Sequence, residues 1–346
     1  MRTAQKLVVA CVLLAVASAA CGDDKPKAQQ STTSRPGGST TAAPTSTTAT
    51  PGPTAILTGL AADAAAATRP AVTVKVENTR AARPQTGLEF ADIIYEEVVE
   101  GGITRLAAIY QSRVPDVVGP VRSVRKTDQA IVRPLQGIFV YSGGAPYAEQ
   151  SIATAPVIRL NESKAGNAMF RDRNRRAPHN LYMRGADVYA KAPDAKGPPP
   201  SLFTYSAVPS VAGVAASHVV VGFRGDYAVV WDWDPAAQRW QRSIFGRKDM
   251  SAAGVQLGAT NVVIQQVNYV GGVRSGPKQG FGAEAQLTGT GKGWVLTNGR
   301  AIAATWKRAS PSEPGEWVDA DGVTIALAPG TTWVELPEPS YPISIR

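Results

Sequence analysis

The stretch from Arg83 to Arg125 restricts the possible folds of this chain most, because it combines a strand-type pattern with dense charge. Apolar and β-branched residues run on both sides of Gly101-Gly102, and a glycine pair between two such runs indicates a tight β-hairpin. Any fold must place the charged side chains of this stretch on the hairpin or next to it. They are Asp92, Glu96, Glu97, Glu100, Arg83, Arg105, Arg122 and Arg125.

A two-residue turn at 101–102 predicts the register of this hairpin. It pairs Glu100 with Ile103 and Val98 with Arg105, so that Arg105 lies diagonally between Glu96 and Glu100. The opposite face is nearly all apolar, and we expect it to face the core. A shift of one residue would exchange the two faces. The charged face is open to two interpretations, a solvated ion-pair network or the polar wall of a ligand cleft.

A helix is predicted after Gly119-Pro120, with Ser123 as its N-cap and with its last residues near Arg133, before Pro134. Arg122 and Arg125 would then add positive charge to the start of the helix, where anionic groups bind readily. For helix stability alone, acids are preferred in the first turn. The two arginines therefore indicate an anion site.

Two further segments of the first half supply candidate ligand contacts. Ser142, Gly143 and Gly144 follow a predicted strand at 138–141, and such a loop can approach a ligand closely, although it lacks the spacing of a phosphate loop. Ser142 has no G-x-S-x-G context, which argues against a nucleophile. His179 and Asn180 lie in the arginine-rich run 171–182. That run is typical of a solvated loop, but a histidine can transfer protons near neutral pH.

The first 20 residues predict an export signal, with a basic start and a short apolar run that ends in small residues. Cys21 follows directly, and Ala19-Ala20-Cys21 resembles a bacterial lipobox, with Ser18 where leucine is usual. We expect diacylglyceryl on Cys21 and acyl chains such as palmitate, because two chains give stable anchoring. Cleavage after the Ala17-x-Ala19 pattern, which would release a secreted protein, is the alternative.

Residues 21–55 are rich in Ser, Thr and Pro and contain almost no large apolar side chain. Such a segment cannot bury a core, and we expect it to be disordered. A flexible segment of this length spans roughly 30 Å. It would serve as a tether that holds the folded part away from a membrane, or as low-complexity filler.

The remaining chain predicts an α+β fold in two parts, because 346 residues are enough for two domains. Residues 56–200 are predicted to form a mixed α/β domain that carries the charged motifs. Residues 201–346 show many short strand signals and an Asn298-Gly299 turn, which favour an antiparallel sandwich or barrel-like domain. Tryptophans of this half could stack on sugars, but core positions are the commoner case. They are Trp231, Trp233, Trp240, Trp294, Trp306, Trp317 and Trp333.

Charge and composition narrow the classes of ligand and partner. The formal net charge of +9 could attract anionic lipid or anionic wall polymers. No nucleic-acid-binding module is visible, so nucleic acid is not an expected partner. No His/Cys cluster indicates a metal site, and no cofactor motif is present.

Several short motifs together resemble one family, the YerB-like bacterial lipoproteins, whose shared domain has no assigned function. They are RPQTGL (83–88), ADIIYE (91–96), EGGITR (100–105), GPVRSVR (119–125), SGG (142–144) and APHNLY (177–182). The likeness extends over about residues 57–335 and includes the G-x-W-x-L-x-N-G-R run of the second half. It implies a two-part architecture and a lipid-anchored protein on the extracytoplasmic side of the cell membrane. It brings no reaction, cofactor or catalytic residue with it.

Three functional hypotheses follow. The first is a binding protein for an anionic wall polymer, peptidoglycan or an envelope protein. Its expected contacts are Arg83, Arg105, Arg122, Arg125, Ser142, Gly143, Gly144, His179 and Asn180. The second is an envelope glycan hydrolase or transferase that uses Glu96 or Glu100 with His179. In the third, the charges are purely structural and a partner binds elsewhere.

Overall fold

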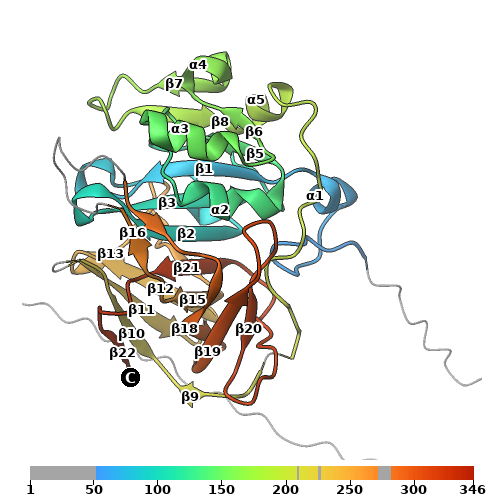
Figure 1. Ribbon diagram of the computed structural model, residues 1–346, viewed down its shortest axis with the longest axis vertical. Helices are drawn as coiled ribbons and strands as arrows, with labels where there is room; N and C mark the ends of the chain where they lie inside the picture. The colour runs from blue at the N-terminus through green and yellow to red at the C-terminus, as the bar shows by residue number, and fades with distance from the viewer. Residues whose placement is uncertain (1–51, 209, 225–226, 272–281) are drawn as a thin grey trace, which may run out of the picture. The chain divides into compact units, whose positions relative to one another are not determined.

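The computed structural model describes residues 52–208, 210–224, 227–271 and 282–346 (Figure 1). The predicted signal peptide, Cys21 and nearly all of the predicted tether lie outside these residues. By their contacts, residues 51–346 form one compact unit. Its secondary structure is mostly strand with a smaller share of helix, so the fold is α+β. No helix in the described part of the chain has the length and apolar character needed to span a lipid bilayer.

One eleven-stranded sheet organises the unit, and it contains strands from both predicted parts of the chain (Figure 1). The predicted boundary near residue 200 stays a prediction, because this sheet passes across it. Ten strands lie side by side and β9 (Val214–Ala215) pairs with β19. The order is β20 (Glu316–Val318), β19 (Arg300–Arg308), β18 (Gly289–Thr297), β15 (Asn261–Gln265), β21 (Thr332–Leu336), β2 (Ile93–Val98), β3 (Thr104–Tyr110), β1 (Val72–Glu77), β5 (Ile138–Val140) and β6 (Ile158–Leu160).

The strand β21 joins the two halves of this sheet. It pairs in parallel with β2 on one side and with β15 on the other. Its five residues, Glu335 included, are all buried, as in a central strand that is covered on both faces. The sheet around it is therefore mixed, and the second half of the chain is not purely antiparallel.

Helices cover one face of the first half of the sheet. Ala130 and Ile131 of α2 (Asp128–Val132) pack with Ile93 and Ile109 of the hairpin. Ala148 of the next helix, α3, packs with Phe139 on the same face. Five helices and five 3-10 turns are described. The helices are α1 (Ala64–Thr68), α2, α3 (Pro146–Ala153), α4 (Glu162–Ala165) and α5 (Gly185–Ala190), and the turns are η1 (Arg80–Ala82), η2 (Leu88–Phe90), η3 (Glu100–Gly102), η4 (Arg133–Leu135) and η5 (Gly166–Ala168).

Two smaller sheets cover the other face and bury a second apolar layer. Val74 and Leu106 of the main sheet share this layer with Met183 of the three-stranded sheet and with Trp231 of the six-stranded sheet. The smaller sheets comprise β4 (Val117–Val118), β8 (Leu181–Arg184) and β7 (Met169–Arg171); β13 (Arg247–Lys248), β12 (Arg239–Ile244), β11 (Ala228–Asp234), β10 (His218–Gly222), β22 (Ile343–Ile345) and β14 (Gly258–Ala259); and the separate pair β16 (Tyr269–Val270) and β17 (Glu284–Ala285).

The predicted register of the β2–β3 hairpin is wrong by one residue. Glu97 lies opposite Arg105 and Val98 opposite Thr104, because η3 makes a three-residue connection in place of the two-residue turn. Arg105 therefore shares a face with Glu97 and not with Glu96. The shift exchanges the residues on the two faces of the hairpin. The fold tolerates it because both faces of this sheet are covered and both sides of the hairpin are buried.

The helix predicted from Ser123 begins later, at Asp128. Ser123 and Arg125 lie in chain without regular secondary structure, so neither Arg122 nor Arg125 is in the first turn of a helix. The backbone of Arg122 instead lies beside β1, since its N–H donates to the carbonyl of Lys75 at 2.8 Å. Of the short strand signals predicted for residues 201–346, the one at 323–327 is wrong, because only isolated bridges occur there.

Other predictions for the second half are confirmed. Asn298 and Gly299 form a two-residue turn with φ of 52° and 67°, and Thr297 lies opposite Arg300 across it. The core interpretation of the tryptophans is confirmed for the five that are buried, which are Trp231, Trp240, Trp306, Trp317 and Trp333.

Candidate functional site

The candidate site lies where two parallel strands end. Glu77 is the last residue of β1, and Ser142 follows β5, its parallel neighbour. The segment 121–124 crosses these strand ends, because the Ser142 N–H donates to Arg122 O at 3.0 Å and the Val124 N–H donates to Gly143 O at 3.0 Å. The carboxyl ends of parallel strands are the usual place for ligands in sheets of this kind.

Three arginines gather at this edge. Nη1 of Arg105 donates to the carbonyl oxygen of Ser123 at 2.9 Å, which brings it under the segment that carries Arg122 and Arg125. Burial, together with the positive charges of Arg125 and Arg122, lowers the pKa of Arg105 to about 10. Nη1 of Arg125 donates to the same carbonyl oxygen of Ser123 at 3.4 Å, so Arg105 and Arg125 share one acceptor. We refer to Arg105, Arg122 and Arg125 as the arginine cluster.

Glu77 and Glu100 supply the matching negative charge. Glu77 Oε2 lies 3.5 Å from Nε of Arg122 and 2.8 Å from Nδ1 of His179. Nε of Arg125 donates to Glu100 at 2.6 Å, and the hydroxyl of Tyr147 donates to the other oxygen of Glu100 at 3.1 Å. Burial alone would raise the pKa of Glu100, but the charge of Arg125 and the hydrogen bonds outweigh it and lower the pKa.

The glycine loop borders the cluster. A Cβ at Gly144 would lie 2.5 Å from Val124, whereas a Cβ at Gly143 would meet open space. Gly143 has φ of 135°, a conformation that only glycine adopts readily. The hydroxyls of Ser142 and Ser123 lie 3.4 Å apart. Gly144 is therefore needed for close packing, and Gly143 leaves space beside the two serines.

A fully buried trio lies on the same sheet face, further along β1. Nζ of Lys75 contacts Glu97 and donates to Asp128 at 2.7 Å. The pKa of Glu97 is raised to about 7, mainly by burial. The positive charge of Lys75 acts to lower this pKa, and the negative charge of Asp128 acts to raise it. The trio fixes the cluster, because Asp128 also accepts a 2.6 Å hydrogen bond from the N–H of Arg125.

Sequence reasoning missed Lys75, Glu77 and Asp128. The alternation in VTVKVE (72–77) carries a signal for two of them. Thr73, Lys75 and Glu77 are spaced by two residues and so share one face of a strand. Polar residues at every second position of a buried strand indicate a polar layer on that face.

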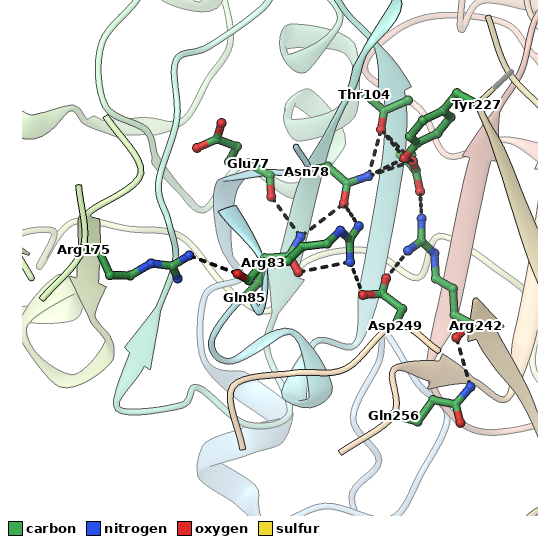
Figure 2. Close-up of polar contacts among 11 residues, drawn as sticks. Glu77, Asn78, Arg83, Gln85, Thr104, Arg175, Tyr227, Arg242, Asp249 and Gln256 are labelled. Atoms are coloured by element: carbon green, nitrogen blue, oxygen red, sulfur yellow. Dashed lines mark hydrogen bonds and ion pairs between the residues drawn. The ribbon is translucent and has the colours of Figure 1, made fainter. Parts of the chain in front are cut away.

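Several predicted site residues lie elsewhere. Arg83 contacts Asp249 of the second half of the chain (Figure 2). The side-chain oxygen of Asn180 accepts from Arg171 at 2.9 Å. The carboxylate of Glu96 lies on the opposite sheet face, where it contacts Arg242 and accepts from Tyr227 at 2.6 Å. The structure thus gathers Arg105, Arg122, Arg125, Ser142, Gly143, Gly144, Glu100 and His179, and leaves Arg83, Asn180 and Glu96 apart.

The catalytic pair expected from Glu96 or Glu100 with His179 is not formed in the contacts of the described residues, because His179 binds Glu77. That contact uses Nδ1 and leaves Nε2 of His179 for a ligand. Both donors and one carboxylate reach the surface of the cluster, since 23% of Arg122, 25% of His179 and 25% of Glu100 are exposed against 3% of Glu77. The arrangement is suited to binding a group that is anionic and rich in hydrogen-bond acceptors. The described residues contain no group of three His, Cys, Asp or Glu side chains placed to hold a metal ion.

Comparison with known families agrees with the motifs that surround this site. Residues 57–198 match the description "Protein of unknown function (DUF3048) N-terminal domain", and residues 219–334 match the corresponding C-terminal domain. The chain belongs to the DUF3048 family. The resemblance to YerB-like proteins is thereby confirmed.

One similar protein is named "Putative lipoprotein YerB", from Bacillus subtilis (strain 168). It is 28% identical to this DUF3048 chain over 293 residues, which are 81% of this chain and 85% of the relative. The crystal structure of YerB from Bacillus subtilis is similar with a TM-score of 0.73 and 27% identity, over 84% of this chain and 99% of that one. The two proteins therefore share their fold across nearly the whole of the crystallised YerB chain.

Proposed function

We propose that this DUF3048 protein is a lipid-anchored protein of the bacterial cell envelope that binds an anionic, glycan-containing ligand at the arginine cluster. The similarity to a protein named as a lipoprotein supports the location, together with the predicted lipobox at Cys21. The anchor would be diacylglyceryl on Cys21, on the extracytoplasmic side of the membrane.

The convergence of Arg105, Arg122 and Arg125 on the ends of parallel strands carries the proposed binding role. Arginine side chains bind carboxylate and phosphate through paired N–H groups. Glu100, whose side chain is 25% exposed, remains partly available as an acceptor for hydroxyl groups. A ligand with both anionic and hydroxyl groups, as in an anionic wall polymer or peptidoglycan, uses both kinds of contact.

The test is binding to purified cell wall. The full chain in detergent is mixed with wall that carries its anionic polymers and with wall from which they have been removed. We expect the double variant Arg122→Gln/Arg125→Gln to weaken binding by about tenfold, equivalent to about 1.4 kcal/mol.

The control is Arg171→Gln, which removes an arginine that is half exposed and paired with Glu162. Loss of anionic polymers should weaken binding if they are the ligand, whereas unchanged binding to stripped wall would identify peptidoglycan. Equal binding by wild type and the double variant to both preparations would overturn the proposal.

A further inference from the structure

A second basic pocket lies away from the arginine cluster, between η1 and the β12–β13 hairpin. Its volume is about 370 Å³, within the range of small-molecule sites. The two walls come from opposite halves of the sequence. Arg80, Arg83 and Pro84 form one side, and Ile244, Phe245, Arg247, Lys248, Asp249, Met250 and Ser251 form the other.

Positive charge is in excess around this pocket. Asp249 is the one acid among the residues that line it, and it already contacts both Arg83 and Arg242 (Figure 2). Arg247 and Lys248 are exposed and have no ion-pair partner among the described residues. The pocket thus carries four cationic side chains, Arg80 among them, against a single carboxylate that is already engaged.

Phe245 forms the apolar wall, in a backbone conformation that is unfavourable for it. Phe245 and Gly246 make the turn between β12 and β13 with φ of 54° and 72°, where asparagine and glycine are preferred. The ring packs edge-on against Tyr227 with centroids 5.4 Å apart, and the guanidinium carbon of Arg80 lies 3.9 Å from its centroid. Local strain of this kind is characteristic of binding sites.

Two buried polar atoms at the pocket have no hydrogen-bond partner among the described residues. They are Oγ of Ser251, a residue that is 2% exposed, and Nε of Arg83. Buried polar groups are nearly always paired in native proteins, so these two atoms are unsatisfied donors in residues that line the cavity. This observation is independent of the charge excess.

We propose that this pocket binds a phosphate ester. The phosphate group would contact Arg83, Arg247 and Lys248, and the carbon part would pack on Phe245 and Met250. A doubly charged group with three free oxygens matches several converging cations better than a single carboxylate does. Such an ester could be a soluble phosphate metabolite or the headgroup of a phospholipid. The inference does not depend on the proposed role of the arginine cluster.

The test uses isothermal titration of the full chain in detergent with three probes. They are glycerol 3-phosphate, dihexanoyl phosphatidylglycerol below its critical micelle concentration, and dihexanoyl phosphatidylcholine. We expect at least one of the two anionic probes to bind and to lose about tenfold in affinity in Arg247→Gln/Lys248→Gln. Binding of glycerol 3-phosphate identifies a soluble ester, and binding of phosphatidylglycerol alone identifies a lipid headgroup.

The matched control is Lys292→Gln/Lys307→Gln, which removes the same charge from exposed positions of β18 and β19. The anionic probes should bind this control as they bind wild type. A second variant, Phe245→Asn, suits the turn conformation and removes the aromatic wall, so weaker binding by a folded protein is expected. The proposal is overturned if neither anionic probe binds, or if the pocket variant and the control lose affinity equally.

Discussion

The arginine cluster and the β12–β13 pocket are both rich in cations, yet they differ in how those cations are balanced. In the cluster, Glu77 contacts Arg122, and Glu100 contacts Arg125. In the pocket, Arg247 and Lys248 have no carboxylate partner in the part of the chain that the structure describes. The first arrangement holds its side chains in fixed positions, while the second leaves charge available.

Because of this difference, substitution of a paired arginine and of an unpaired one should have different effects on stability and on anion binding. Removing one member of a buried pair leaves the other charged and unsolvated, which destabilises the fold. Removing an exposed cation without a partner has little effect on stability but weakens attraction for an anion. Stability and binding measurements therefore separate the two regions.

The largest effect is expected for Arg242, a fully buried arginine that contacts both Glu96 and Asp249. Replacing it by leucine would leave the buried carboxylate of Glu96 without a counter-charge and would leave Asp249 with Arg83 alone. We expect Arg242→Leu to lower the free energy of unfolding by about 3–5 kcal/mol. Urea denaturation measures this, with Arg247→Leu as the control at an exposed arginine. A loss below about 1 kcal/mol would show that pairing does not govern the cost.

The Lys75 trio refines the comparison, because one cation there faces two acids. The pKa of Glu97 is raised to about 7 by burial, so the folded protein retains its proton where the unfolded chain releases it. The stability gained is present below the ordinary pKa of about 4.5 and is lost as pH rises through 7. The free energy of unfolding of wild type should therefore fall by up to about 3 kcal/mol as pH rises across this range. We expect Glu97→Gln to abolish this fall.

Denaturation of wild type and Glu97→Gln at several pH values between about 4.5 and 8 measures that difference. Glu162→Gln serves as the control, because Glu162 forms an exposed pair with Arg171. Parallel pH curves for wild type and Glu97→Gln would contradict the raised pKa of Glu97.

A substitution at Glu77 would make the cluster resemble the pocket. Glu77→Gln removes the charge that Arg122 and His179 share, and we expect a loss of about 1–2 kcal/mol in stability. The uncompensated Arg122 should at the same time strengthen binding to anionic wall polymer. Sedimentation with purified wall measures this, and weaker binding by a folded Glu77→Gln protein would mean that Glu77 itself contacts the ligand.

The smallest effect on stability is expected in the pocket. Arg247→Gln/Lys248→Gln should change the free energy of unfolding by no more than about 0.5 kcal/mol, because both side chains are exposed. Thermal unfolding of this variant, compared with the Lys292→Gln/Lys307→Gln control, measures the change. A larger loss would mean that Arg247 and Lys248 stabilise the fold.

Local features of the fold were predictable from the sequence. The Asn298-Gly299 turn and the strand 332–336 follow from turn chemistry and from β-branched runs. The hairpin register was not predictable, because both faces of β2 and β3 are buried and the apolar pattern does not select one. The parallel pairing of β21 with β2 joins residues more than 200 positions apart, and no local signal encodes it.

The candidate site was predictable in part. Arg105, Arg122, Arg125 and His179 are singled out by charge in a strand-rich region, and the structure places them together. Arg83 has the same local signal but turns to Asp249, since its partner lies in the second half of the chain. Glu77 and Lys75 show how an acid and a base can be hidden in a short strand, where the side chains alternate between two covered faces.

The position of β21 has a consequence for how the protein is made. The chain is synthesised from its first residue onward, and β2 and β15 have no common neighbour until residues 332–336 exist. Until then both strands present an open edge, which favours pairing with other chains. Early termination near residue 330 would thus leave two such edges in the middle of the sheet. Residues 332–336 therefore cover both of these edges at once.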